Sequence, residues 1–270
     1  MTIRLCRRAR FSAGDTGSLT GRAGGHDYSC ELAVAGEIDP DSGMVVNIRD
    51  IDAVMKSEIV ALLDGKILDR DVSALQSTPA TPENLARFLW ERCIGKMPPQ
   101  GRLVRLTLWE SDVHWATLSS ASMERDEPLL TVTRMYDFSA SHRLHSQSLS
   151  NEENAEIFGK CNWENGHGHN YEIEITLSGA PDARTGEIAP MALLDQIVEE
   201  EVLRPFDHKH LNYDVPEFSG LNPTSENVTK VIWEKLANRL ANAPLGPAKL
   251  YRVLVRETPR NVFEYYGEEP

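Results

Sequence analysis

The chain has few cysteines, no long apolar run and a deficit of positive charge. Its four cysteines, among 270 residues, form no CxxC pair and are too sparse for a disulfide framework. No apolar run approaches the ~20 residues of a membrane-spanning helix. The formal net charge of −13 argues against nonspecific binding to nucleic acid, which requires a basic surface. We therefore expect a globular protein without membrane or nucleic-acid partners.

The N-terminal segment also lacks a targeting pattern. The first residues are basic, but no apolar segment of a signal peptide follows them, so we expect a cytoplasmic protein. The length allows one large domain or two small ones, each with a core of its own.

An internal repeat divides the chain into two halves. An offset of 143 residues carries His26-Asp27-Tyr28 onto His169-Asn170-Tyr171, and Thr81-Pro82-Glu83-Asn84 onto Thr224-Ser225-Glu226-Asn227. Before this stretch, Phe11-Ser12-Ala13 matches Phe138-Ser139-Ala140 at an offset of 127, so the second half has 16 additional residues between its first two expected strands. We predict domains at 1–118 and 131–270, joined by a polar linker at Ser119–Pro128.

Each half is expected to have the same order of elements. In the second half, apolar alternation predicts strands at 131–144, 169–179, 250–258 and 261–266. Helical periodicity predicts helices at about 191–206 and 225–242, the latter capped by Thr224. This ββααββ order predicts an α+β fold, in which an antiparallel four-stranded sheet carries its helices on one face.

Three histidines lie at the ends of two of these expected strands. His167 and His169 are two apart on a strand and can share a face, and His142 lies at the end of the preceding apolar run. Three imidazoles with an open position are typical of a catalytic metal centre, which would make the nearby Cys161 a reactant instead of a fourth ligand. A lone histidine in such a pattern is more often structural, so that the HGH run would be a tight strand entry and His142 a core residue. Zn²⁺ suits neutral imidazoles, and the ligand type leaves Fe²⁺ and Mn²⁺ open.

Several motifs extend this pattern. FGKCNWENGHGHNY (158–171), FSASHRL (138–144) and FDHKHLN (206–212) resemble the 6-pyruvoyl-tetrahydropterin synthase family, which includes the bacterial 6-carboxy-tetrahydropterin synthases of queuosine biosynthesis. The resemblance covers roughly residues 131 to 267, with the motifs in the family's order. It implies two tandem tunnelling-fold (T-fold) domains whose sheets associate edge to edge into a barrel. A homo-oligomer is then expected, and a trimer of two-domain chains would supply six such units.

The resemblance also implies roles for individual residues. His142, His167 and His169 match the family's zinc ligands, and Cys161 matches its general base. His208 would be the relay partner of the cysteine, oriented by Asp207. Glu257 matches the glutamate that holds the pterin ring through two hydrogen bonds, and the resemblance also counts it as a catalytic residue of the proton relay. The residues Thr224, Ser225 and Glu226 resemble a Thr-Thr-Glu segment that contacts substrate, although Glu226 also suits the first turn of a helix.

The implied activity is that of a zinc-dependent lyase. It would convert 7,8-dihydroneopterin triphosphate to 6-pyruvoyl-tetrahydropterin with elimination of triphosphate, as in tetrahydrobiopterin biosynthesis. The five-residue gap between Cys161 and His167 resembles this branch of the family. One alternative is 6-carboxy-5,6,7,8-tetrahydropterin synthesis from the same substrate. Another is a non-catalytic, zinc-stabilised protein that binds pterins or serves in an assembly. Arg143, Lys160 and Lys209 could supply positive charge for the phosphates.

The first half lacks most of these groups. Asp15 stands where the second half has His142, Gly24 where it has His167, and Gly65 where it has His208. The thiol has no counterpart, because the 16 additional residues that contain it are missing. We expect a degenerate domain without zinc, which acts as a structural partner. Whether its Glu83 or Glu110 completes a site across an interface stays open.

Overall fold

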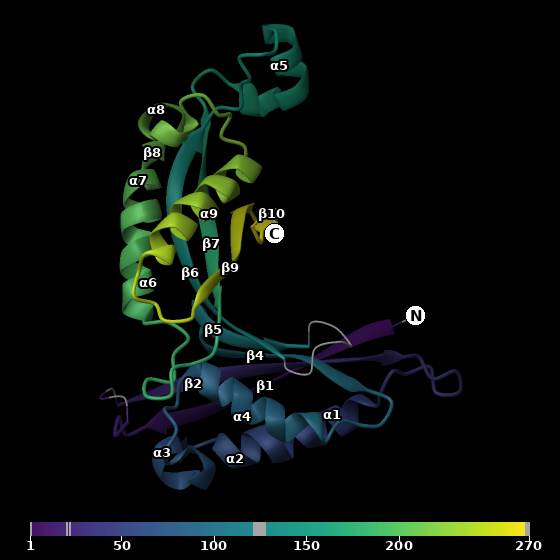
Figure 1. Ribbon diagram of the computed structural model, residues 1–270. Helices are drawn as coiled ribbons and strands as arrows, with labels where there is room; N and C mark the ends of the chain where they lie inside the picture. The colour runs from purple at the N-terminus through teal and green to yellow at the C-terminus, as the bar shows by residue number, and fades with distance from the viewer. Residues whose placement is uncertain (1, 20, 22, 121–127, 268–270) are drawn as a thin grey trace. The chain divides into compact units, whose positions relative to one another are not determined.

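The computed structural model describes residues 2–19, 21, 23–120 and 128–267 (Figure 1). Most of the expected linker, residues 121–127, lies outside the described residues. The chain forms two compact units. The first contains the residues up to Thr133, together with Ser178–Ala189 and Gly246–Ala248. The second contains Arg134–Leu177, Pro190–Leu245 and the residues from Lys249 on. A connection from the second half of the sequence is thus part of the first unit.

The first unit is built on a mainly antiparallel sheet. Its strand order is β3-β1-β2-β4-β5, in which only the short β3 runs parallel to its neighbour β1. Figure 1 shows α1, α2 and α4 together on one side of this sheet. The elements are β1 (Thr2–Asp15), β2 (Gly24–Glu37), α1 (Ile48–Met55), α2 (Ala61–Leu63), β3 (Lys66–Ile67), α3 (Leu68–Asp71), α4 (Pro82–Ile94), β4 (Arg102–Ser111) and β5 (His114–Ser119).

The second unit repeats this arrangement. Its strand order is β10-β9-β7-β6, and the short β8 pairs in parallel with the end of β6. Helix α9 packs on β9 and β10. The elements are β6 (Leu129–His142), α5 (Asn151–Phe158), β7 (His167–Ser178), α6 (Met191–Val198), α7 (Arg204–Phe206), β8 (Lys209–His210), α8 (Leu211–Asp214), α9 (Ser225–Ala241), β9 (Lys249–Thr258) and β10 (Asn261–Tyr265). The predicted α+β class, with antiparallel sheets and helices on one face, is confirmed.

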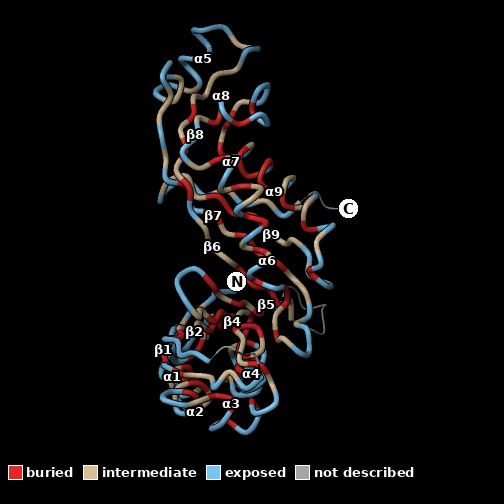
Figure 2. Tube along the Cα trace, turned by 90° about the vertical axis from the view of Figure 1, so that its left-hand side faces the viewer, coloured by how far each residue is buried: buried red, intermediate tan, exposed pale blue. Residues whose placement is uncertain are grey.

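The periodicities of the sequence explain the two sides of each layer. On β7, Tyr171, Ile173 and Ile175 are fully buried, whereas the residues between them are more exposed. Burying such a side chain contributes about 1.5–3 kcal/mol. Figure 2 shows buried positions following the strands and the inner sides of the helices. Within the described ranges, no helix combines the length and apolar character that a membrane span requires.

The predicted helix at 191–206 is continuous but contains one wider turn. Residues Glu199–Leu203, between α6 and α7, form a π-helical turn, and Lys56–Val60 do the same between α1 and α2. The two turns lie at equivalent positions of the repeat. Such turns insert a residue into a helix and commonly occur near functional sites. Sequence periodicity alone did not predict them.

The 16 additional residues of the second half form an ordered segment between β6 and β7. It contains α5 and a 3₁₀ turn at Gly159–Asn162. Ser150 and Glu153 form a capping box at the start of α5. Asn154 is fully buried and donates to the backbone carbonyls of Ser146 and Leu149. These hydrogen bonds give the segment that carries Cys161 a defined path.

Candidate functional site

Three imidazoles converge at one end of the second unit's sheet. His142 is the last residue of β6, and His167 and His169 lie at the start of β7. One nitrogen from each ring lies within 4.8 Å of the other two, and His142 Nε2 is 3.3 Å from His167 Nε2. The predicted convergence of these side chains is therefore present in the structure.

The hydrogen bonds of the cluster favour the binding of a cation. His142 Nδ1 lies 2.7 Å from the carbonyl oxygen of Pro223, which can only accept, so Nδ1 carries the proton and Nε2 keeps a lone pair. Burial lowers the pKa of His142 to about 4 and also lowers the pKa of His169. His169 Nε2 is buried without a hydrogen-bond partner. A divalent metal ion among these rings would satisfy all three facing nitrogens.

A fixed carboxylate lies beside the three histidines. Glu257 Oε1 is 3.8 Å from the Nε2 atoms of both His142 and His169. The Ser225 hydroxyl donates to Oε1 at 2.7 Å, and Asn261 Nδ2 donates to Oε2 at 3.0 Å. Burial raises the pKa of Glu257, but these hydrogen bonds from Asn261 and Ser225 outweigh it and hold the pKa below its ordinary value. The group is a preoriented anion at neutral pH.

Asp207 and His208 form a second polar pair between α7 and β8. Asp207 Oδ1 accepts from the Ser139 N–H at 2.8 Å, and Oδ2 lies 2.8 Å from His208 Nδ1. These hydrogen bonds, from Ser139 first and His208 second, lower the pKa of Asp207. The carboxylate therefore orients an imidazole whose side chain is 82% exposed.

The backbone of His208 is unusual. With φ at +56°, it is the only non-glycine residue among those described that has a left-handed backbone. Its N–H donates to the Ser139 carbonyl at 2.6 Å, which holds the conformation. Such strain costs about 1–3 kcal/mol and occurs mostly at functional sites. Gly65 occupies the equivalent position of the first half, with φ at +69° and the same hydrogen bond to Ser12.

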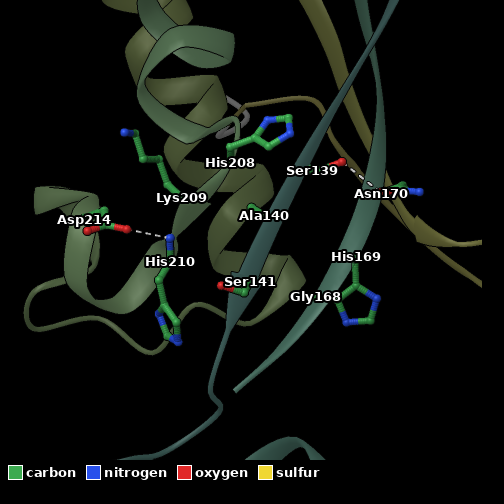
Figure 3. A pocket seen from close by; sticks show the side chains of 10 residues that line it. All are labelled: Ser139, Ala140, Ser141, Gly168, His169, Asn170, His208, Lys209, His210 and Asp214. Atoms are coloured by element: carbon green, nitrogen blue, oxygen red, sulfur yellow. Dashed lines mark hydrogen bonds between the residues drawn. The ribbon is translucent and has the colours of Figure 1, made fainter. Parts of the chain in front are cut away.

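A pocket of about 570 Å³ lies against this pair (Figure 3). His208 and His169 both border it, so it touches the acid–base pair and one member of the histidine cluster. Cys161 does not line this pocket. The backbone carbonyl oxygen of Cys161 accepts a hydrogen bond from the Leu144 N–H at 2.8 Å. The pocket is lined by Ser139, Ala140, Ser141, Gly168, His169, Asn170, His208, Lys209, His210 and Asp214.

The remaining predicted residues have separate positions. Thr224 caps α9 and accepts from the Asn227 N–H at 3.4 Å. Glu226 is exposed on the first turn of that helix, whereas the neighbouring Ser225 reaches Glu257. The substrate contacts expected of Thr224 and Glu226 stay predictions, as does a relay between Cys161 and His208.

Two groups at the site were not predicted from the sequence. Asn261 could have been found from the repeat, because the first half places His114 against Glu110 at the same spacing, with Nδ1 3.1 Å from the carboxylate. The carbonyl of Pro223 could not have been predicted, because every residue has a backbone carbonyl and its identity does not show which one accepts from a histidine.

Comparisons with known proteins agree with the repeat. The family model of 6-pyruvoyl tetrahydropterin synthase matches residues 7–121 and again 131–268. The 6-pyruvoyl tetrahydrobiopterin synthase of Homo sapiens is 47% identical over 137 residues, which are 51% of this chain and 91% of that protein. The Drosophila melanogaster enzyme of the same name is 42% identical over 144 residues, 53% of this chain and 83% of its own. A solved structure of the Caenorhabditis elegans 6-pyruvoyl tetrahydropterin synthase is 43% identical, with a TM-score of 0.49, and the match covers 52% of this chain and 97% of that one.

Proposed function

Because the chain belongs to the 6-pyruvoyl tetrahydropterin synthase family, we propose that its second half, residues 131–270, is a zinc-dependent lyase. It converts 7,8-dihydroneopterin triphosphate to 6-pyruvoyl-tetrahydropterin and releases triphosphate. The observation that carries this proposal is the convergence of three imidazoles beside the fixed carboxylate of Glu257. The first half lacks this set and is a structural partner, and the working protein is a homo-oligomer.

The metal ligands are His142, His167 and His169. Three protein ligands in place of four are typical of a catalytic zinc site and not of a structural one. When bound, Zn²⁺ would polarise the oxygens of the substrate's side chain and acidify the adjacent C–H bonds. The hydrogen bond from His142 to the Pro223 carbonyl fixes the tautomer that this role requires.

Proton transfer is assigned to Cys161 and His208. Only the thiolate form of a cysteine can accept a proton, and a nearby cation favours that form. His208 carries protons to and from the substrate's side chain while triphosphate leaves. Asp207 sets the direction of the His208 ring, since the carboxylate is itself held by the Ser139 N–H.

Ring binding is assigned to Glu257. An ionised carboxylate can accept from two adjacent N–H donors of an aminopyrimidine edge. Ser225 and Asn261 hold the two carboxylate oxygens of Glu257 in place. The carboxylate would therefore bind the pterin ring in one orientation. This positioning brings the reacting carbons within reach of the proton carriers. Thr224 and Glu226 are proposed as further substrate contacts on the same helix start.

The decisive experiment is product analysis with the zinc-loaded full chain. Incubation with 7,8-dihydroneopterin triphosphate should give the pyruvoyl product and triphosphate, detected by mass spectrometry. Cys161→Ala should lower the rate by about 10²–10⁴-fold without loss of zinc, because only a proton carrier is removed. Cys6→Ala, at an exposed cysteine of the first half, is the matched control and should react like the wild type.

Other products or no turnover would change the assignment. A 6-carboxy-tetrahydropterin product, made with the same dependence on Cys161, would place the protein in the queuosine branch. No turnover by verified zinc-loaded wild type would contradict the lyase proposal and support a non-catalytic pterin-binding or assembly role.

A further inference from the structure

One face of the first unit's sheet carries several arginines. Helices α1, α2 and α4 lie together on one side of this sheet (Figure 1), and Phe11 and Ala13 of β1 are buried. Successive side chains of a strand point to opposite faces of its sheet. Arg4, Arg8 and Arg10 therefore point away from the face of Phe11 and Ala13, and all three arginines are exposed.

Residues of β2 and β4 extend this face. Glu31 of β2 lies directly opposite Arg8 in the strand pairing. Its carboxylate accepts a hydrogen bond from Arg8 at 3.1 Å and another from Arg105 at 2.9 Å. The Arg8 guanidinium also lies 4.4 Å from the centroid of the Trp109 ring, which is a cation–π contact. We call the side formed by Arg4, Arg8, Arg10, Glu31, Arg105 and Trp109 the open face.

The positive charge of the open face exceeds its negative charge. Arg8 and Arg105 share the single carboxylate of Glu31, and their side chains remain 51% and 42% exposed. Arg4 and Arg10 make no hydrogen bond or ion pair with any residue that the structure describes. The chain as a whole has a formal net charge of −13, so this positive surface is a local feature.

The corresponding face of the second unit balances its charges. Arg252 and Glu174 lie where the first unit has Arg105 and Glu31, and they also form an ion pair. Arg252 is in addition 3.1 Å from the carboxylate of Glu264. The arginine–glutamate pair therefore belongs to the repeat, and in the second unit a further carboxylate accompanies it.

The positions around this pair differ between the two halves. In the second half Arg256 pairs with Glu172 at 3.1 Å, whereas the first half has Trp109 and Ser29 at these positions. Three other exchanges make the open face more positive: Arg8 for Met135, Arg10 for Asp137 and Thr117 for Glu264. The excess of positive charge is therefore particular to the first half, and the sheet can be built without it.

We propose that the open face of the first unit binds a chain of phosphates, such as inorganic triphosphate or the triphosphate group of a nucleotide. The planar guanidinium group donates paired N–H groups that match the oxygens of a phosphate. Arg8 and Arg10 are two residues apart, about 7 Å along the strand, and Arg105 reaches the same area from β4. A single phosphate would engage one or two of these arginines, whereas a chain of phosphates can engage all three.

This binding role is separate from the proposed lyase activity. The open face belongs to the first unit, and the histidine cluster belongs to the second. The first half would then have a ligand of its own besides its structural role. A failure of either proposal leaves the other standing.

Calorimetric titration of the zinc-loaded full chain with inorganic triphosphate tests the proposal. Wild type should bind, with an affinity that falls as salt is added, because exposed charges are screened. Arg8→Gln and Arg10→Glu should each raise the dissociation constant by about tenfold or more. Arg87→Glu is the matched control for Arg10→Glu, because it makes the same change of charge at an exposed position of α4. It should change the dissociation constant by less than about twofold.

Two further titrations identify the site and the source of the phosphates. His169→Ala lacks a proposed metal ligand of the second half and should bind triphosphate as the wild type does. Titration with GTP distinguishes a nucleotide from inorganic triphosphate. Tighter binding of GTP would add a contact between its base and Trp109, and equal binding would assign recognition to the phosphates alone. Either result supports the site.

Four results would overturn the proposal. The first is a wild type that does not bind triphosphate, and the second is an equal loss of affinity in Arg10→Glu and Arg87→Glu. The third is binding that Arg10→Glu keeps and His169→Ala loses, which would assign it to the histidine cluster. The fourth is tighter binding of polyglutamate than of triphosphate, because the ligand would then be an acidic protein segment.

Discussion

The two halves carry the same site framework with different chemistry. In the second half, His169 Nε2 lies 3.8 Å from Glu257 Oε1, and in the first half His26 Nε2 lies 3.8 Å from Glu110 Oε1. The distances agree although the neighbouring residues differ. The framework that places a histidine against a carboxylate is therefore set by the strands, and it is kept although the other two histidines of the cluster are absent from the first half.

What differs is the set of side chains around this pair. Asp15 replaces His142 at the end of the first strand and lies near the buried hydroxyl of Tyr28, whose pKa is raised by burial first and by the charges of Glu110 and Asp15. One imidazole is replaced by the carboxylate of Asp15 and another by Gly24, so a single imidazole is left of the three that suit zinc. The comparison shows that the fold fixes positions, and that a few side chains at those positions decide whether a metal can bind.

The largest expected effect comes from a matched pair of histidine substitutions. His169→Ala removes one of three proposed metal ligands, so bound zinc after dialysis and the initial rate should each fall at least about 100-fold. His26→Ala changes the equivalent residue of the first half and should leave both unchanged. Elemental analysis and product formation measure the two effects.

Either of two results would break this comparison. An equal loss in both variants would show that the first half takes part in metal binding or turnover. Full zinc content in His169→Ala would show that the three histidines do not form the metal centre.

A second pair tests the strained backbone at His208. His208→Gly should slow the reaction by about 10²-fold, because a proton carrier is lost. Its free energy of unfolding should stay equal or rise by about 1 kcal/mol, because glycine relieves the left-handed strain and the ring is exposed. Gly65→His should do the reverse, with an unchanged rate and a free energy of unfolding lower by about 1 kcal/mol.

The four proteins to compare are the wild type, His208→Gly, Gly65→His and the variant that carries both substitutions. Urea denaturation measures their free energies of unfolding, and initial rates measure their activities. If His208→Gly lost several kcal/mol of stability, the imidazole would be a packing residue and its strain would have no functional meaning.

The sequence predicted the parts of this picture that depend on local spacing. Histidines two apart on a strand must share a face, so His167 and His169 could be paired, and the alternation that ends at His142 placed the third ring on the neighbouring strand. Helical periodicity likewise predicted helices at about 191–206 and 225–242, where the structure has α6, α7 and α9. These features depend on residues that are close together in the sequence.

Other features depend on residues that are distant in sequence. The left-handed backbone of His208 follows from its hydrogen bond to Ser139, and the tautomer of His142 from the Pro223 carbonyl. The attachment of Ser178–Ala189 to the first unit arises from packing against α4, which no periodicity encodes. Such contacts could not be derived from one sequence, because they depend on the completed fold.

The smallest expected effect concerns Glu83, which is buried where its counterpart Glu226 is exposed. Burial raises the pKa of Glu83 above its ordinary 4.5, so the unfolded chain releases this proton at a lower pH than the folded chain. Stability therefore falls as the pH rises between the two pKa values and stays lowered above them. Glu83 Oε1 accepts from the Ile188 N–H, and Glu83→Gln keeps an acceptor there and does not titrate.

The glutamine variant should therefore match the wild type near pH 4 and have a higher free energy of unfolding and a higher Tm at pH 7. Thermal unfolding between pH 4 and 8 measures the difference. Glu91→Gln, on the exposed side of the same helix, is the control and should differ from wild type by less than about 0.5 kcal/mol at every pH. If Glu83→Gln were less stable than the wild type at every pH from 4 to 8, the contact with the Ile188 N–H would require the negative charge. The folded protein would then favour the ionised form of Glu83, which contradicts the prediction.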